Sequence, residues 1–94
     1  MIVRILHEGQ YRLSGATAER LRDADARLVA ELGAMDEEGF RTAYGEMLTL
    51  VRREGTPLPE AEIHESDLIL PAADTTLEEA RALFHPSVGD SAPA

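Results

Sequence analysis

One amphipathic helix constrains the fold of this chain more than any other feature of its sequence. Asp36 is a good N-cap, because its carboxylate accepts a hydrogen bond from an otherwise unpaired amide of the first turn. Gly55 follows as a C′ residue, and Pro57 prevents continuation. Between these signals, apolar side chains recur at helical spacing, namely Phe40, Ala43, Tyr44, Met47, Leu48 and Val51. We therefore predict a helix that runs from the Asp36 cap to residue 54.

A second apolar stripe precedes this helix and predicts an antiparallel partner for it. Either Ser14 or Thr17 caps this earlier helix, and Gly33 ends it. Its stripe consists of Ala18, Leu21, Ala24, Leu28, Val29 and Leu32. Because the turn around Gly33 is short, the two helices must pack antiparallel. Asp25 falls inside the stripe, so it is either paired at the stripe's edge with Arg4, Arg12 or a backbone amide, or turned toward a partner.

The polar sides of the two helices carry weaker signals. Asp23, Arg27 and Glu31 are spaced four residues apart and are expected to form ion pairs worth a few tenths of a kcal/mol each. Gly45 and Thr49 lie off the apolar stripe of the second helix. These two residues are either neutral substitutions that the helix tolerates or part of a contact surface.

The N-terminus has the pattern of a β-hairpin. Residues 2–6 are mostly β-branched and apolar, residues 10–13 alternate, and Gly9 between them suits a positive φ. A hairpin is marginal by itself, so it must lie on the helices or find a third strand in this chain or in another copy. An uncapped hairpin edge is also a template for pairing, so we expect self-association through it.

The stretch from Thr56 to Ala73 cannot form a continuous helix, because three prolines interrupt it. The apolar triplet 68–70 within it is either a short strand or an extended segment across the core. A third helix then starts with a capping box, from Thr75 to Glu78 or from Thr76 to Glu79. Its apolar side is formed by Leu77, Ala80, Leu83 and Phe84.

These elements predict an α+β fold in which the N-terminal β-hairpin packs on the antiparallel helical hairpin. The short C-terminal helix closes one edge, in the order ββααα. Residues 1–84 are expected to form a single domain. Residues 85–94 are small and polar apart from one valine, and we expect a disordered tail there.

The charge of the chain is concentrated after the second helix. The formal net charge is −9, which argues against binding to a nucleic-acid backbone. No Lys or Arg lies between Arg53 and Arg81, whereas eight acids do: Glu54, Glu60, Glu62, Glu65, Asp67, Asp74, Glu78 and Glu79. This stretch is either a solvated face or a docking strip for a basic partner. The candidate partner-binding residues are Glu60, Glu62, Glu65, Asp67, Leu68 and Ile69.

The sequence offers no pattern of catalytic or metal-binding residues. His7, His64 and His85 are far apart, and the short spacings of zinc ligands are missing. Neither a nucleophile elbow nor a phosphate-binding glycine motif is present. We therefore expect no enzyme activity, no metal and no cofactor. The chain has no cysteine and no apolar run long enough to span a membrane, so a cytoplasmic protein is expected.

Four segments together resemble the PspAA, or PspA-associated, domain. They are MIVRILHEGQYRL at residues 1–13, GTPLP at 55–59, SDLILP at 66–71 and DTTLEEAR at 74–81. The match runs in order over about residues 1–84. It departs from the family pattern at His7, where a glycine is expected in the hairpin, and at Gly45, which interrupts a helix usually richer in alanine and leucine.

The resemblance implies a small, non-enzymatic accessory protein of the phage-shock-type envelope stress response. Its implied partner is phage shock protein A, a long helical coiled-coil protein that coats stressed membranes. The chain would then reach the membrane only through this partner, and no catalytic residues carry over. The alternative is a sensor of a small ligand or stress signal, with a pocket between the hairpin and the helices.

Overall fold

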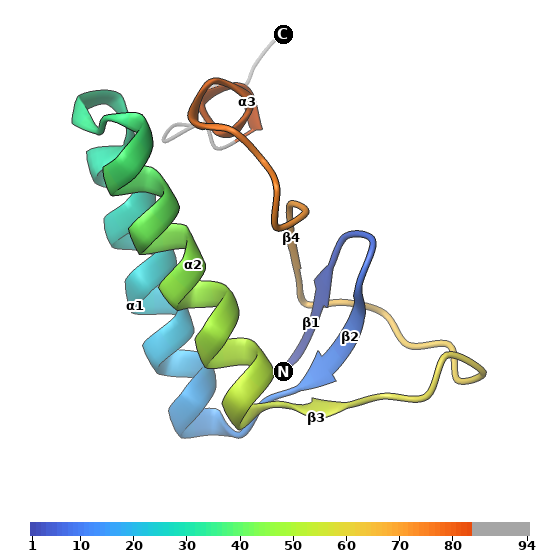
Figure 1. Cartoon of the computed structure of the whole chain (residues 1–94). Coiled ribbons are helices and arrows are strands. Elements are labelled where there is room, and N and C mark those ends of the chain that lie inside the picture. Colours follow the sequence, from blue (N-terminus) through green and yellow to red (C-terminus); the bar gives the residue numbers. More distant parts are fainter. Residues whose placement is uncertain (84–94) are drawn as a thin grey trace, which may run out of the picture.

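The computed structural model describes residues 1–83 as an α+β fold, in which a small sheet lies beside two long antiparallel helices (Figure 1). The elements in chain order are β1 (Ile2–Ile5), β2 (Gly9–Arg12), α1 (Gly15–Glu31), the 3-10 turn η1 (Leu32–Ala34), α2 (Glu37–Glu54), β3 (Thr56–Pro57), β4 (Leu68–Leu70) and α3 (Leu77–Leu83). The predicted α+β class is confirmed. The predicted order ββααα is incomplete, because two short strands stand between α2 and α3. Phe84, His85 and the predicted tail lie outside the described residues.

The sheet has four strands in the order β3-β2-β1-β4. β1 pairs antiparallel with β2 and parallel with β4, while β2 pairs antiparallel with β3. Both edges of the hairpin are therefore occupied by strands of the same chain. The expected self-association through an exposed hairpin edge is wrong in its premise, because β3 and β4 take the two positions that another copy would need.

The turn of the hairpin explains why glycine is the expected residue at His7. His7 has a φ of 68°, in the left-handed region that a side chain disfavours, and Gly9 has a φ of 144°. A histidine is tolerated here at some cost in strain.

The helical pair is capped as predicted at both starts. Ser14 Oγ accepts a hydrogen bond from the Thr17 amide at 3.3 Å, and Asp36 Oδ1 accepts one from the Gly39 amide at 2.7 Å. The end of α2 differs from the prediction, because Gly55 has an extended backbone with a φ of −86°. A Cβ on Gly55 would lie 2.6 Å from the Val51 carbonyl oxygen and 2.8 Å from Leu13 Cδ2. Glycine is needed there for close packing rather than for a left-handed cap.

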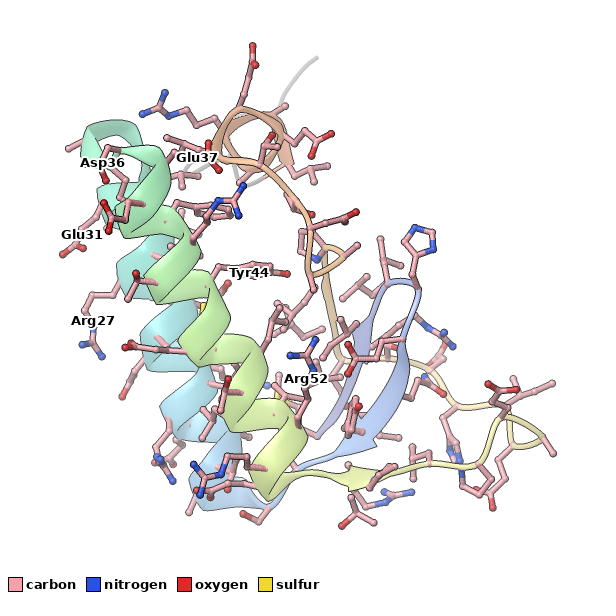
Figure 2. All side chains as sticks on the ribbon, viewed as in Figure 1. Arg27, Glu31, Asp36, Glu37, Tyr44 and Arg52 are labelled. Carbon is pink, nitrogen blue, oxygen red and sulfur yellow. The ribbon has the colours of Figure 1, made fainter. Side chains whose placement is uncertain are left out.

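The core lies between the sheet and the helices. Its buried apolar residues come from β1, the three α-helices, η1, β4 and the residue after β2, and include Val3, Ile5, Leu13, Leu21, Leu28, Leu48, Val51 and Leu70. Tyr44 bridges the layers: its ring stacks on Phe40 at 5.4 Å between centroids, and its hydroxyl donates to the Pro71 carbonyl at 2.6 Å. Figure 2 shows Tyr44 reaching from α2 toward the sheet side of the molecule. This bond fixes the exit of β4 against α2.

α3 is attached to the tip of the helical pair by its two ends. Thr76 and Glu79 form the capping box, each side chain accepting a hydrogen bond from the other residue's amide at 3.0 and 3.1 Å. The Glu37 carboxylate accepts from the Leu77 amide at 3.3 Å. Arg81 donates to three carbonyl groups at the end of α1 and η1, those of Leu32, Gly33 and Met35. A cation thus meets the negative end of a helix dipole.

Candidate functional site

The candidate partner-binding residues lie mostly on one loop, which we call the acidic loop (residues 58–67). It connects β3 to β4 and extends to the side of the sheet opposite the helices (Figure 1). The loop begins and ends with backbone pairing, because the Leu58 amide donates to the Gln10 carbonyl at 2.9 Å and the Asp67 amide to the Ile2 carbonyl at 2.7 Å. Its two ends are therefore continuous with the sheet.

Gln10 fastens the middle of the acidic loop to the sheet. Its register partner on β1 is Arg4, which is exposed, so both side chains project from the face away from the core. Gln10 is nevertheless 8% exposed, because the loop covers it. Its Nε2 donates to the His64 carbonyl and to Ser66 Oγ, both at 2.9 Å. The buried amide is thus satisfied by the loop, and the loop is held in one shape.

The acids of the loop face solvent. Glu60, Glu62 and Glu65 are all exposed, and among them only Glu62 has an ionic partner in the described chain, His64 Nε2 at 2.9 Å. Between them stands Ile63, which is 97% exposed. Sequence reasoning missed Ile63. The signal was an isolated β-branched residue set among acids in a proline-bounded segment.

The other three candidates divide between structure and surface. Asp67 is exposed, but its carboxylate accepts a hydrogen bond from the Ile2 amide at 2.7 Å, so it holds the first strand in place. Leu68 is half-buried against the core. Ile69, next in the strand, is 56% exposed, and Leu70 is fully buried. The structure therefore brings Glu60, Glu62 and Glu65 together on the acidic loop and places Ile69 on the strand that follows.

A charged cluster ties the hairpin turn to the end of α2. Arg52 donates two hydrogen bonds to the Glu8 carboxylate, at 2.7 and 2.8 Å, and the Tyr11 hydroxyl donates a third at 2.7 Å. Figure 2 shows Arg52 extending from α2 toward the hairpin. The bonds from Arg52 and then Tyr11 lower the pKa of Glu8 from 4.5 to about 2. The donors of this cluster, Arg52 and Tyr11, therefore hold the hairpin turn against α2.

Asp25 is the second unusual carboxylate. Its Oδ1 is buried without a hydrogen-bond partner among residues 1–83, so the expected pairing with an arginine or a backbone amide is not formed there. Burial raises the pKa of Asp25, and burial together with the charge of Asp25 raises the pKa of Tyr44. The arrangement destabilises a charged Asp25.

The described residues give little support to a metal or ligand site. Over residues 1–83, no three His, Asp or Glu side chains converge as metal ligands would. Buried side chains such as Val3, Ile5 and Val51 fill the space between the hairpin and the helices, where the sensor hypothesis places its pocket.

Within residues 1–83 neither long helix combines the length and the apolar character that crossing a membrane requires. A family model described as PspA-Associated protein matches residues 1–91. No curated protein matches the chain, and no solved structure does.

Proposed function

Since the chain belongs to the PspA-Associated protein family, we propose that it is a non-enzymatic adaptor that binds a phage shock protein A-type coiled-coil protein through the acidic loop. The observation that carries the proposal is Ile63, 97% exposed between carboxylates on a loop that Gln10 holds in place. The family supplies the partner, and the loop supplies the surface.

The acidic loop suits a helix with a basic and apolar stripe. Its carboxylates attract a basic surface over distances comparable to the Debye length and so accelerate encounter. Ile63, with Ile69 on the adjacent strand, then offers apolar area for contact. Because hydrogen bonds already fix the shape of the loop, little conformational entropy is lost when the partner binds. The protein would reach a membrane only through this partner.

The proposal is tested by measuring association with purified phage shock protein A at several salt concentrations. Replacing Glu60, Glu62 and Glu65 by Gln should slow association and flatten its dependence on salt. Ile63→Ser should instead speed dissociation and leave the salt dependence as it is. Both changes affect exposed side chains, so the fold should be retained.

The matched control removes three other exposed acids, Glu19, Glu38 and Glu78, and so changes the net charge equally. This control should bind nearly as the wild type does. If the acidic-loop variant and Ile63→Ser both bind with wild-type rates, the acidic loop is only a solvated face. If the control slows association as much as the acidic-loop variant, net charge and not the loop governs encounter.

A further inference from the structure

The helical pair has a second face that the sheet does not cover. A shallow groove, which we call the outer groove, runs between α1 and α2, and its charged rim on α1 is formed by Arg20, Asp23, Arg27 and Glu31. Its floor is apolar, and Ala24, Met35, Ala43 and Leu50 in it remain partly accessible. In Figure 2, Arg27 and Glu31 point away from the sheet. A further helix can therefore approach α1 on this side.

The charges along the α1 rim of the outer groove are largely unused by the described chain. The expected ion pairs of Arg27 with Asp23 and with Glu31 are not formed, since the ion pairs of residues 1–83 are Arg20–Glu54, Arg41–Glu37, Arg52–Glu8 and His64–Glu62. Arg20 alone on this rim has a partner, at 3.1 Å on the exposed surface. Asp23, Arg27 and Glu31 are exposed and stay available to another molecule.

The order of these charges is self-complementary. Along α1 the signs run positive, negative, positive, negative, at Arg20, Asp23, Arg27 and Glu31. An antiparallel copy of α1, related by a two-fold axis near Asp25, places Asp23 opposite Arg27 and Arg20 opposite Glu31. Each pair then occurs twice, as an isologous interface requires. Ala24 lies near the axis, where its small side chain permits close approach of the two helices.

We infer that the outer groove binds a second copy of this chain, with the two α1 helices antiparallel and the two helical pairs stacked face to face as a four-helix bundle. The partly accessible apolar floor is buried on association, and the four ion pairs select the antiparallel register. The acidic loop lies beyond the sheet, away from this interface, and remains free in the dimer (Figure 1). The inference is therefore independent of the proposed function.

Sedimentation equilibrium of the whole chain at high micromolar concentration and low salt tests the inference. The wild type should sediment with twice the mass of one chain. Asp23→Arg places like charges opposite Arg27 twice, and Arg27→Asp does the same opposite Asp23. Each substitution should weaken the dimer roughly tenfold, because it turns two attractive pairs at the exposed rim into repulsive ones.

The decisive arm mixes the two variants. In a mixed dimer every cross-axis pair is of opposite sign again, so an equimolar mixture should dimerise at least as well as the wild type. The double variant D23R/R27D, which exchanges the two charges within one chain, should also recover. Circular dichroism and thermal unfolding verify that each variant is folded. The inference is overturned if the wild type is a monomer, or if both single variants dimerise as strongly as the wild type. It is also overturned if the equimolar mixture dimerises no better than either variant alone.

Discussion

The helical pair and the segment that returns from it are held in place by different kinds of interaction. Residues 14–55 form two helices whose caps bind amides three residues away, at Ser14 and at Asp36. The return segment (residues 56–83) has only short elements and is fixed by distant groups. Gln10 lies more than fifty residues from its acceptors, and Asp67 is 65 residues from Ile2. Local signals therefore define the first region, whereas contacts with residues remote in the chain define the second.

The strongest test of this difference is on β4, the strand of the return segment that pairs with β1. Leu70→Ala should lower the free energy of unfolding by about 2–5 kcal/mol, because Leu70 is fully buried and its truncation leaves a cavity. Its neighbour Ile69 is 56% exposed, so Ile69→Ala should cost less than about 1 kcal/mol. Urea unfolding measures both. Equal losses would show that β4 does not insert its alternate side chain into the core.

This contrast also sets what the sequence predicts. The N-caps at Ser14 and Asp36, the length of α2 and the antiparallel turn follow from nearby residues and are confirmed, whereas the predicted cap conformation at Gly55 is not. The capping box needed the structure to decide between Thr75 and Thr76, because both lie three residues before a glutamate. The sequence offers a strand as one of two alternatives for β4 and does not predict β3, since a two- or three-residue strand is defined by its partner more than by its own composition.

The candidate site followed the same rule. The acids of the loop are exposed as a partner-binding surface requires, and their density could be read directly from the sequence. Ile69 is exposed as well. The role of Gln10 was not predictable, since a glutamine in a hairpin reads as a solvated residue until a distant loop covers it. The hydrogen bond of Asp67 was not predictable either, because its partner, the Ile2 amide, is remote in the chain.

Two glycines sharpen the comparison at the boundary of the regions. Gly55→Ala should destabilise the protein by about 1–3 kcal/mol, because the new Cβ meets Val51 O and Leu13 Cδ2 within 3 Å. Gly45→Ala should stabilise it by up to about 1 kcal/mol, since nothing lies within 4 Å and alanine is the better helix former. Thermal unfolding of both variants should show opposite shifts. A stabilising Gly55→Ala would mean that the chain after α2 can move away from β2.

The attachment of α3 tests the return segment at its far end. Arg81→Gln should cost about 1–2 kcal/mol, because the carbonyl groups of Leu32, Gly33 and Met35 lose a charged donor. Hydrogen exchange at the amides of α3 should quicken before those of α2. Arg53→Gln is the control, as an exposed arginine without an ionic partner in residues 1–83, and should change stability by less than about 0.5 kcal/mol. Uniform exchange in both variants would argue that α3 is held by its apolar side alone.

The smallest expected effects concern pH. The contributions of Glu8 and Asp25 to the free energy of unfolding should change with pH in opposite directions. The pKa of Glu8 is lowered from 4.5 to about 2, so its bonds stabilise the protein above pH 4.5 and this contribution is lost as the pH falls toward 2. Glu8→Gln should cost about 1 kcal/mol at neutral pH, since the cluster lies near the surface, and this cost should fade as the pH falls through about 2. Urea unfolding at several pH values measures this.

Asp25 should behave in the opposite way and qualifies the view that the helical pair is set by local signals alone. Burial raises its pKa above the ordinary 3.8, so the folded state binds the proton more tightly than the unfolded state. The free energy of unfolding therefore falls as the pH rises from 3.8 through the folded pKa, where the half-buried carboxylate becomes charged and its Oδ1 has no hydrogen-bond partner among residues 1–83. Asp25→Asn removes this charge and should gain stability relative to the wild type as the pH rises, by less than Glu8→Gln loses.

The same titration applied to Glu8→Gln is the control, because there the difference grows in the destabilising direction. A pH-independent difference between Asp25→Asn and the wild type would mean that Asp25 is solvated, and that nothing in α1 departs from its local signals.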